Sequence, residues 1–397
     1  MLIEIILFLL LGIFAGTLSG LAPGIHINLI GAILVSLSSS VFAFVNPIYF
    51  AVFIVSMAIA HTFLDFIPSI FLGCPDTDTV LTILPGHELL KNGRGYEAIM
   101  MTNYGSFAAI FILIVISIPS VFLVPKIYNS ISSIIPWILI SVFLITIFYE
   151  KEKISAFAVF AISGILGLII LNIGNLNQPL LPLLSGLFGA SSLIMSIKTK
   201  VKIPKQEITK PKVKFFKPLV GSLFASYICS FLPGLGSGQA SAIGSIFSKK
   251  DRGSFLVLLG ATNTLVMGLS FVALYAIQKT RTGAAASLQG IMGNLSFNIL
   301  ILILAVVLIS GIISFFLTEK FARFFADKIG KINYAKFSFG TLIFLSIIVL
   351  AVSGIMGFFV FIISTLAGIY CISFSVRRTN MMGCLLLPTI LIYLKIV

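Results

Sequence analysis

The chain has 397 residues, of which 59% are hydrophobic and only 10% are charged. Soluble domains average about 45–50% apolar and about 25% charged residues, so no water-soluble fold buries this much apolar surface, and the composition predicts an all-α protein that crosses a membrane many times. The net charge of +14 comes from basic residues in short loops, as is typical of cytoplasmic loops, and no basic-aromatic face or finger spacing indicates binding to nucleic acid.

Apolar runs between charged positions predict the membrane segments. A span needs about 20 apolar residues, and fewer where the helix is interrupted, which predicts roughly 12–14 segments in this chain. The first run has neither a basic stretch before it nor a small-residue cleavage site, so we expect no removable signal peptide. The predicted segments lie near 2–22, 25–45, 47–72, 97–124, 130–148, 154–172, 179–197, 218–233, 236–248, 254–277, 293–317, 337–355, 357–375 and 381–396.

Each half of the chain opens on a Pro-Gly interruption. Pro removes a backbone donor and Gly accepts unusual backbone angles, and unwound backbone at membrane depth is tolerated only inside protein or around water. Paired interruptions are a pointer to the binding site of a secondary transporter, and the amides that follow them suit a carboxylate or phosphate. We therefore predict substrate contacts from Pro23, Gly24, His26 and Asn28 in the first half and from Pro233, Gly234, Gly236, Ser237 and Gln239 in the second.

A second polar cluster runs from His61 to Glu88 and contains three prolines, Pro68, Pro75 and Pro85, which predicts a helix, a hairpin loop and a re-entrant return. Ionisable residues at membrane depth are costly and usually face a cavity or a partner. His61 and Asp65 are four residues apart and would share a helix face, either as a cation or proton relay or as a structural pair. The predicted ion-coupling residues are His61, Asp65, Asp76 and Thr77, with Ser69 in contact with substrate; Asp76 and Asp78 are alternatively caps of the next helix.

The linker over 198–217 carries eight lysines against the single acid Glu207 and has no apolar stripe. We predict a first membrane repeat over 1–197, this cytoplasmic linker, and a second repeat over 218–397. Corresponding turns of the two halves alternate in charge: the turn at 46–47 is uncharged and its counterpart at 249–252 is basic, whereas 150–153 is charged and 353–357 is not. Basic loops stay cytoplasmic, so this alternation predicts inverted-topology repeats with Pro-Gly broken helices and re-entrant hairpins; chance alternation over a few loops is the alternative.

The second half offers Asn263, within 260–264, as a substrate contact. Lys279 and Arg281 fall between two apolar runs. Two interpretations remain open for them: they neutralise an anionic substrate, or they mark a cytoplasmic turn.

A metal enzyme would have to use His26, His61, Asp65 and His87, but no HExxH pattern is present. The four cysteines have no CxxC spacing and are expected to be small buried hydrophobes. We expect no catalytic residue, no metal and no cofactor.

These features together resemble the large membrane subunit of the tripartite tricarboxylate transporters, the TctA-like permease family. The chain is short for that family, and it departs from the family at Pro75-Asp76, at 261–264 and at 278–281. The matching elements are Pro23-Gly24, Pro233-Gly234-Leu235, Ser69-Ile70 with Pro75, Gly86 with Asn92-Gly93-Arg94-Gly95, Gly105-Ser106-Phe107 and Met382-Gly383-Cys384-Leu385-Leu386-Leu387-Pro388.

The resemblance implies import of carboxylates on a cation gradient, together with an extracytoplasmic solute-binding protein and a small membrane subunit. We therefore predict a multi-pass permease of the cell membrane that carries a di- or tricarboxylate with Na⁺ or H⁺. Two alternatives remain open: a translocase of polyprenyl phosphates on a similar scaffold, in which Lys279 or Arg281 meets the lipid phosphate, and an intramembrane enzyme that uses His61 and Asp65.

Overall fold

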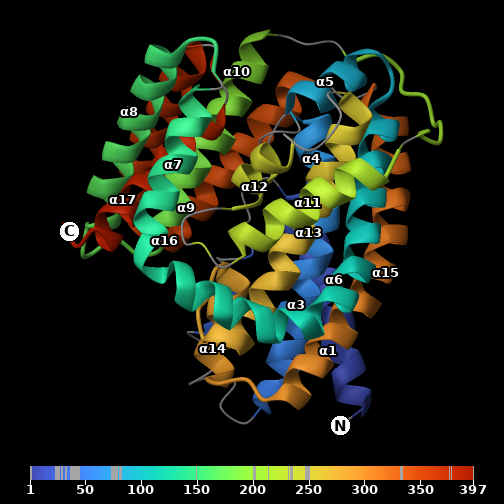
Figure 1. Ribbon diagram of the computed structural model, residues 1–397. Coiled ribbons are helices and arrows are strands. Elements are labelled where there is room, and N and C mark those ends of the chain that lie inside the picture. Colours follow the sequence, from blue (N-terminus) through green and yellow to red (C-terminus); the bar gives the residue numbers. More distant parts are fainter. Residues whose placement is uncertain are drawn as a thin grey trace.

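The computed structural model confirms an all-α protein built to cross a membrane many times (Figure 1). Among the residues that the structure describes, seven helices are long and apolar enough to span a bilayer, and four shorter apolar helices accompany them. Within the described residues every element is helical. The structure describes residues 2–22, 27, 30–31, 34–35, 45–72, 79, 83–148, 150–199, 203–212, 214–230, 232, 236–245, 251–330, 334–374, 376 and 378–396.

The helices form two groups. We call the larger group the central body; its members are α1 (Leu2–Leu21), α3 (Pro47–Leu64), α4 (Phe66–Phe71), α5 (Ile83–Lys91), α6 (Gly95–Ile131), α11 (Phe216–Cys229), α12 (Ser237–Gly244), α13 (Arg252–Ile277), α14 (Gly283–Met292) and α15 (Phe297–Ile329). We call the other the flanking body; its members are α7 (Ile135–Phe148), α8 (Lys153–Leu171), α9 (Leu180–Leu184), α10 (Ser191–Thr199), α16 (Tyr334–Ser373) and α17 (Gly383–Tyr393).

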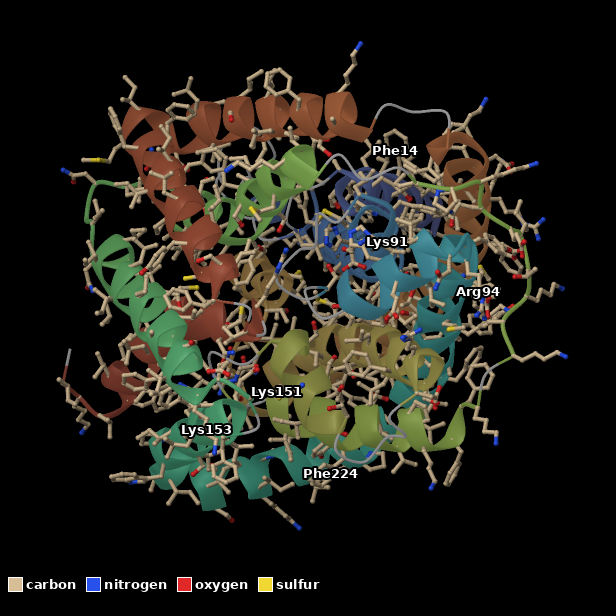
Figure 2. All side chains as sticks on the ribbon, turned by 90° about the horizontal axis from the view of Figure 1, so that it is seen from above. Phe14, Lys91, Arg94, Lys151, Lys153 and Phe224 are labelled. Carbon is tan, nitrogen blue, oxygen red and sulfur yellow. The ribbon has the colours of Figure 1, made fainter. Side chains whose placement is uncertain are left out.

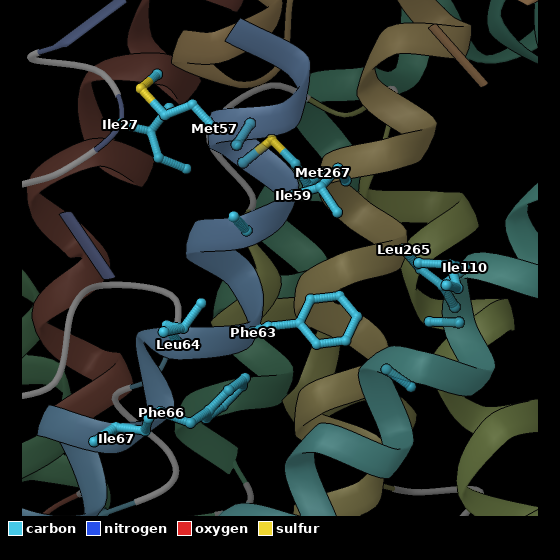
Figure 3. Close-up of a cluster of buried hydrophobic side chains, with 14 of the residues drawn as sticks. Ile27, Met57, Ile59, Phe63, Leu64, Phe66, Ile67, Ile110, Leu265 and Met267 are labelled. Carbon is cyan, nitrogen blue, oxygen red and sulfur yellow. The ribbon is translucent and has the colours of Figure 1, made fainter. Parts of the chain in front are cut away.

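Helices α3 and α13 lie at the centre of the central body and are almost entirely buried. Both have strong starts: the Asn46 side chain accepts from Ile48 N with Pro47 in the first turn, and the Asp251 side chain accepts from Ser254 N. Apolar side chains of both helices fill the core around them, as Figure 3 shows for Phe63 and Leu265. The core is therefore built on one long helix from each half of the sequence.

Small residues let the central helices approach closely. A Cβ built at Gly105 of α6 would clash with the carbonyl oxygen of Val257 on α13, and one built at Gly260 would clash with that of Thr102. In the same crossing Ser106 Oγ donates to the Gly260 carbonyl over 3.0 Å. Close backbone approach through small residues is typical of membrane helix packing, and here it joins the two halves of the chain.

Corresponding helices of the two halves run in opposite directions (Figure 1). Helix α3 runs toward the end of the molecule where α5 lies, and α13 runs from that end toward α14. Helices α6 and α15 form a second opposed pair, in which α15 packs against both α3 and α6. This arrangement is the one that inverted repeats require.

Several predicted segments differ from the observed helices. The gap between the spans predicted over 293–317 and 337–355 is largely helical, because α15 continues to Ile329 and carries its charges on an extended end where Arg323 pairs with Glu319 at 2.7 Å. The two spans expected over 337–355 and 357–375 form α16, bent at Gly354 with φ 66°. The span expected over 47–72 is interrupted at Asp65. Most of the span expected over 25–45 lies outside the described residues.

The flanking body is held together by close helix contacts of its own. A Cβ at Gly167 of α8 would clash with the carbonyl of Cys384 on α17. An apolar layer joins this body to the central body and includes Phe160 and Leu386 on one side and Cys229 and Val266 on the other. Cys229, Cys371 and Cys384 are free and buried, as expected for small hydrophobes, and Cys74 lies outside the described residues.

Candidate functional site

Asp65 lies where the α3–α4 run breaks. Pro68 has no N–H to offer to the carbonyl four residues before it, so the helix is interrupted at this point. The Asp65 side chain is only 4% exposed, and its Oδ2 accepts a hydrogen bond of 2.7 Å from Nδ2 of Asn263 on α13. A buried carboxylate of the first half is thus held by an amide of the second half.

Two threonines extend this contact between the halves. Thr62 Oγ1 of α3 lies 3.3 Å from Thr264 Oγ1 of α13, and Asn263 Nδ2 is 3.4 Å from the Thr62 carbonyl. All three side chains are buried. We call Asp65, Thr62, Asn263 and Thr264 the inter-half cluster. It is a polar group enclosed by the apolar core of Figure 3.

His61 lies one helical turn before Asp65 and contacts α1. Its Nδ1 is 3.0 Å from Ser19 Oγ, and Ser19 also donates to the Gly16 carbonyl. A Cβ at Gly20 of α1 would overlap the Leu64 side chain, so α1 packs tightly along this part of α3. His61 therefore interacts with α1, whereas Asp65 interacts with α13.

Thr79 and α5, which follow α4 in the chain, contact the same region. Ser69 Oγ donates to the Asp65 carbonyl. It also lies 2.6 Å from Oγ1 of Thr79, ten residues later in the chain. Gly86 of α5 then packs on Ile70 of α4. Thr79 and α5 therefore lie against α4, and most of the predicted hairpin loop lies outside the described residues. The remaining predicted contacts Pro23, Gly24, His26, Asn28, Asp76, Thr77, Pro233 and Gly234, and the side chain of Gln239, lie outside the described residues.

In the second half, Gly236 and Ser237 stand at the start of α12, and the Ser237 side chain is buried. Helix α12 packs on α11, where Gly221 and Gly244 meet backbone to backbone. Helix α11 is tied in turn to α13, because Ser226 Oγ is 3.5 Å from the Thr262 carbonyl, next to Asn263. These contacts connect the start of α12 to the helix that carries Asn263.

Lys279 and Arg281 do not belong to the inter-half cluster. They lie in the loop between α13 and α14, and Asn263 is 277 − 263 = 14 residues from the end of α13, which is about 21 Å along a helix. Figure 1 places α14 at the end of the molecule opposite α5. Lys279 is exposed, and Arg281 lies over the Tyr128 ring with its Cζ 5.8 Å from the centroid.

The sequence did not reveal that the basic linker is anchored. Gln206 is buried: its Oε1 accepts from Gly95 N at 2.8 Å and its Nε2 donates to the Leu90 carbonyl at 3.1 Å. The next residue, Glu207, donates its N–H to the Gly93 carbonyl at 2.7 Å. The linker is thus fastened to the loop between α5 and α6, on the face where Figure 2 shows Lys91 and Arg94. A lone amide in a lysine-rich stretch was the available signal.

His87 of α5 lies near both bodies. Burial lowers its pKa to about 4, and the positive charges of Lys91 and of Arg378, in the turn before α17, add to this effect. His87 is therefore neutral at physiological pH. Among the residues that the structure describes, no three His, Cys, Asp or Glu side chains are grouped as a metal site.

Comparison with known proteins covers nearly the whole chain. The chain is 33% identical over 401 residues to an uncharacterized protein of Methanocaldococcus jannaschii. This alignment covers 98% of the chain and 99% of the relative. No solved structure matches. Residues 6–383 match the tripartite tricarboxylate transporter TctA family. The chain belongs to this family, and it is thus a multi-pass membrane component of a transport system with partner subunits.

Proposed function

We propose that the chain is the permease of a cell membrane that carries an organic anion, a di- or tricarboxylate, with Na⁺ or H⁺ as the coupling ion. The observation that supports this proposal best is the buried Asp65 carboxylate held by Asn263 between the two halves of the molecule. Family membership supplies the transport activity, and the inter-half cluster supplies a candidate place for coupling.

An amide is a suitable partner for a coupling carboxylate. Asn263 orients Asp65 through a hydrogen bond and carries no positive charge of its own, so this contact does not neutralise the carboxylate in place of a coupling cation. Binding of either cation neutralises the Asp65 carboxylate, which accepts the hydrogen bond from Asn263. Cation binding therefore changes the free energy of the contact between the halves. A ligand shifts a conformational equilibrium only through such a difference between states.

The anion is expected near the interrupted helices. The start of α12 follows the second Pro-Gly interruption directly, and amides at a helix start suit carboxylate oxygens. Ser69, Gly236, Ser237 and Asn263 are the proposed contacts among the described residues. The solute-binding protein and small membrane subunit implied by a tripartite system are the proposed partners.

Uptake by proteoliposomes tests the proposal. Radiolabelled citrate, malate and succinate are offered to vesicles that contain the full chain and its partner subunits, under an imposed Na⁺ or pH gradient. Asp65→Asn removes the titratable charge and is expected to reduce gradient-driven uptake at least about tenfold. Asp327→Asn, an exposed acid near the end of α15, is the matched control. Full gradient stimulation in Asp65→Asn would overturn the coupling role.

A further inference from the structure

Two nitrogens on one edge of the Arg281 guanidinium group are buried. Its Nε and Nη2 atoms are both buried, and neither has a hydrogen-bond partner within the part of the chain that the structure describes. These two nitrogens form one side of the planar guanidinium group. Their parallel N–H bonds match two oxygens of a carboxylate or a phosphate.

In Arg94 the corresponding edge of the guanidinium group binds a neighbouring carboxylate. Its Nε donates to Glu97 Oε2 and its Nη2 to Glu97 Oε1, each at 2.6 Å. The same pair of atoms is therefore occupied by a carboxylate of the chain itself in one arginine and by no group of the described residues in the other. Because burying a charged donor without an acceptor is costly, an external oxyanion would stabilise the Arg281 side chain where it lies.

Few of the described acids lie at the end of the molecule that carries Arg281. Apart from Glu4 and Asp65, the acids of the described segments lie on α5, at the start of α6, at 150–152, in the linker, at the start of α13 and on the last third of α15. Arg281 lies at the other end of α13, beside α14 (Figure 1). An anion at this end of the molecule thus meets the positive charge of Arg281 and few carboxylates that would repel it.

The loop that carries Arg281 is well ordered by its own contacts. Gln278 ends α13 in a left-handed conformation with φ 53°, and Gln289 Nε2 donates back to its carbonyl. Thr282 Oγ1 accepts from Ala285 N and lies 2.8 Å from Ser270 Oγ. The Tyr128 ring holds the guanidinium from the side of α6. A guanidinium fixed in this way loses little further freedom when it binds an anion.

We propose that the Nε–Nη2 edge of Arg281 binds an oxyanion from outside the chain, either a carboxylate of the transported solute or the phosphate of a lipid headgroup. The site is separate from the inter-half cluster, about 21 Å away along α13. It lies at the end opposite the basic linker, which the positive-inside rule assigns to the outer face. With a soluble carboxylate, the inference rests on the proposed function and gives the solute a first contact before it reaches the proposed contacts near the interrupted helices.

Binding measurements on the purified full chain test this site without any gradient. The probes are citrate, with the protein in nanodiscs of neutral lipid, and phosphatidylglycerol, scored by its co-purification and by the rise in melting temperature that it produces. Arg281→Lys keeps the charge and loses the paired donors, so we expect it to weaken binding of one probe about tenfold or more while the melting temperature in neutral lipid is unchanged. Lys126→Gln, an exposed cation near Tyr128, is the control and is expected to change binding less than about twofold.

The two probes identify the source of the oxyanion. A selective loss of citrate binding assigns the site to the solute, and a selective loss of phosphatidylglycerol binding assigns it to lipid. Neither binding measurement uses a gradient or a variant of Asp65, so a failure of the coupling proposal does not affect this test. The inference is wrong if folded Arg281→Lys binds both probes as the unaltered chain does, or if the unaltered chain binds neither.

Discussion

Helix α13 of the central body and helix α16 of the flanking body differ in how far they are buried. In the apolar 18-residue stretch of α13, 94% of the residues are buried, whereas in that of α16 the share is 28%. The polar inter-half cluster lies in the enclosed body, where neighbouring helices supply its hydrogen bonds. Apolar side chains of α16 such as Phe339 and Ile347 are exposed, as suits a surface in contact with lipid. In the proposed function, coupling would take place in the central body, whose apolar core encloses the inter-half cluster.

The largest loss of stability is expected on substitution of Asn263, in the buried inter-half cluster of the central body. Asn263→Ala leaves the buried Asp65 carboxylate without its amide donor, which should lower the free energy of unfolding by about 2–3 kcal/mol. Combined with Asp65→Asn in a double-mutant cycle, the two changes should be non-additive, because they remove the same contact. Thermal unfolding in detergent measures this. Strictly additive effects would show that the residues act independently.

A matched pair of glycines contrasts the two bodies directly. Gly105→Ala places a methyl group against the Val257 carbonyl and should destabilise the protein by about 1–3 kcal/mol. Gly340→Ala in α16 meets nothing within 4 Å and should stabilise its helix by up to about 1 kcal/mol. Melting temperatures of the two variants should move in opposite directions. Equal shifts would contradict the difference in packing.

The anchor of the linker gives a smaller effect. Gln206→Ala removes its hydrogen bonds to Gly95 and Leu90, each contributing about 1 kcal/mol to holding the linker. Trypsin should then cleave the linker lysines faster, and amide exchange over 203–212 should rise. Lys210→Ala, which is exposed, is the control. Unchanged exchange in Gln206→Ala would show that other contacts hold the linker.

The smallest effect concerns the place where His87 lies near Arg378 of the flanking body. The pKa of His87 is about 4 in the folded chain against 6.5 ordinarily, so the unfolded chain binds the proton more readily. Its contribution to stability is fully present above about pH 6.5 and is lost as the pH falls toward 4. His87→Gln should flatten the dependence of melting temperature on pH over this range. An identical pH profile in the variant would rule out titration of His87.

Sequence reasoning recovered the features that depend on local composition. Apolar runs identified the long helices, because a membrane segment needs an apolar run of sufficient length wherever it packs. It failed at α15, whose charged end was assigned to a turn, because hydropathy marks the edge of the bilayer and not the end of a helix. It also missed Gln206, whose burial depends on a loop more than a hundred residues away.

By itself the sequence determined that this chain is an all-α membrane protein of a transporter family, and it singled out Asp65 as an unusual charge in an apolar segment. Only the tertiary structure decided that Asp65 pairs with Asn263, nearly two hundred residues away, and that Arg281 lies at the far end of the same helix. The physical reason is that apolar content and helix breaks are properties of neighbouring residues. Hydrogen bonds between helices depend on which faces meet after the segments have packed.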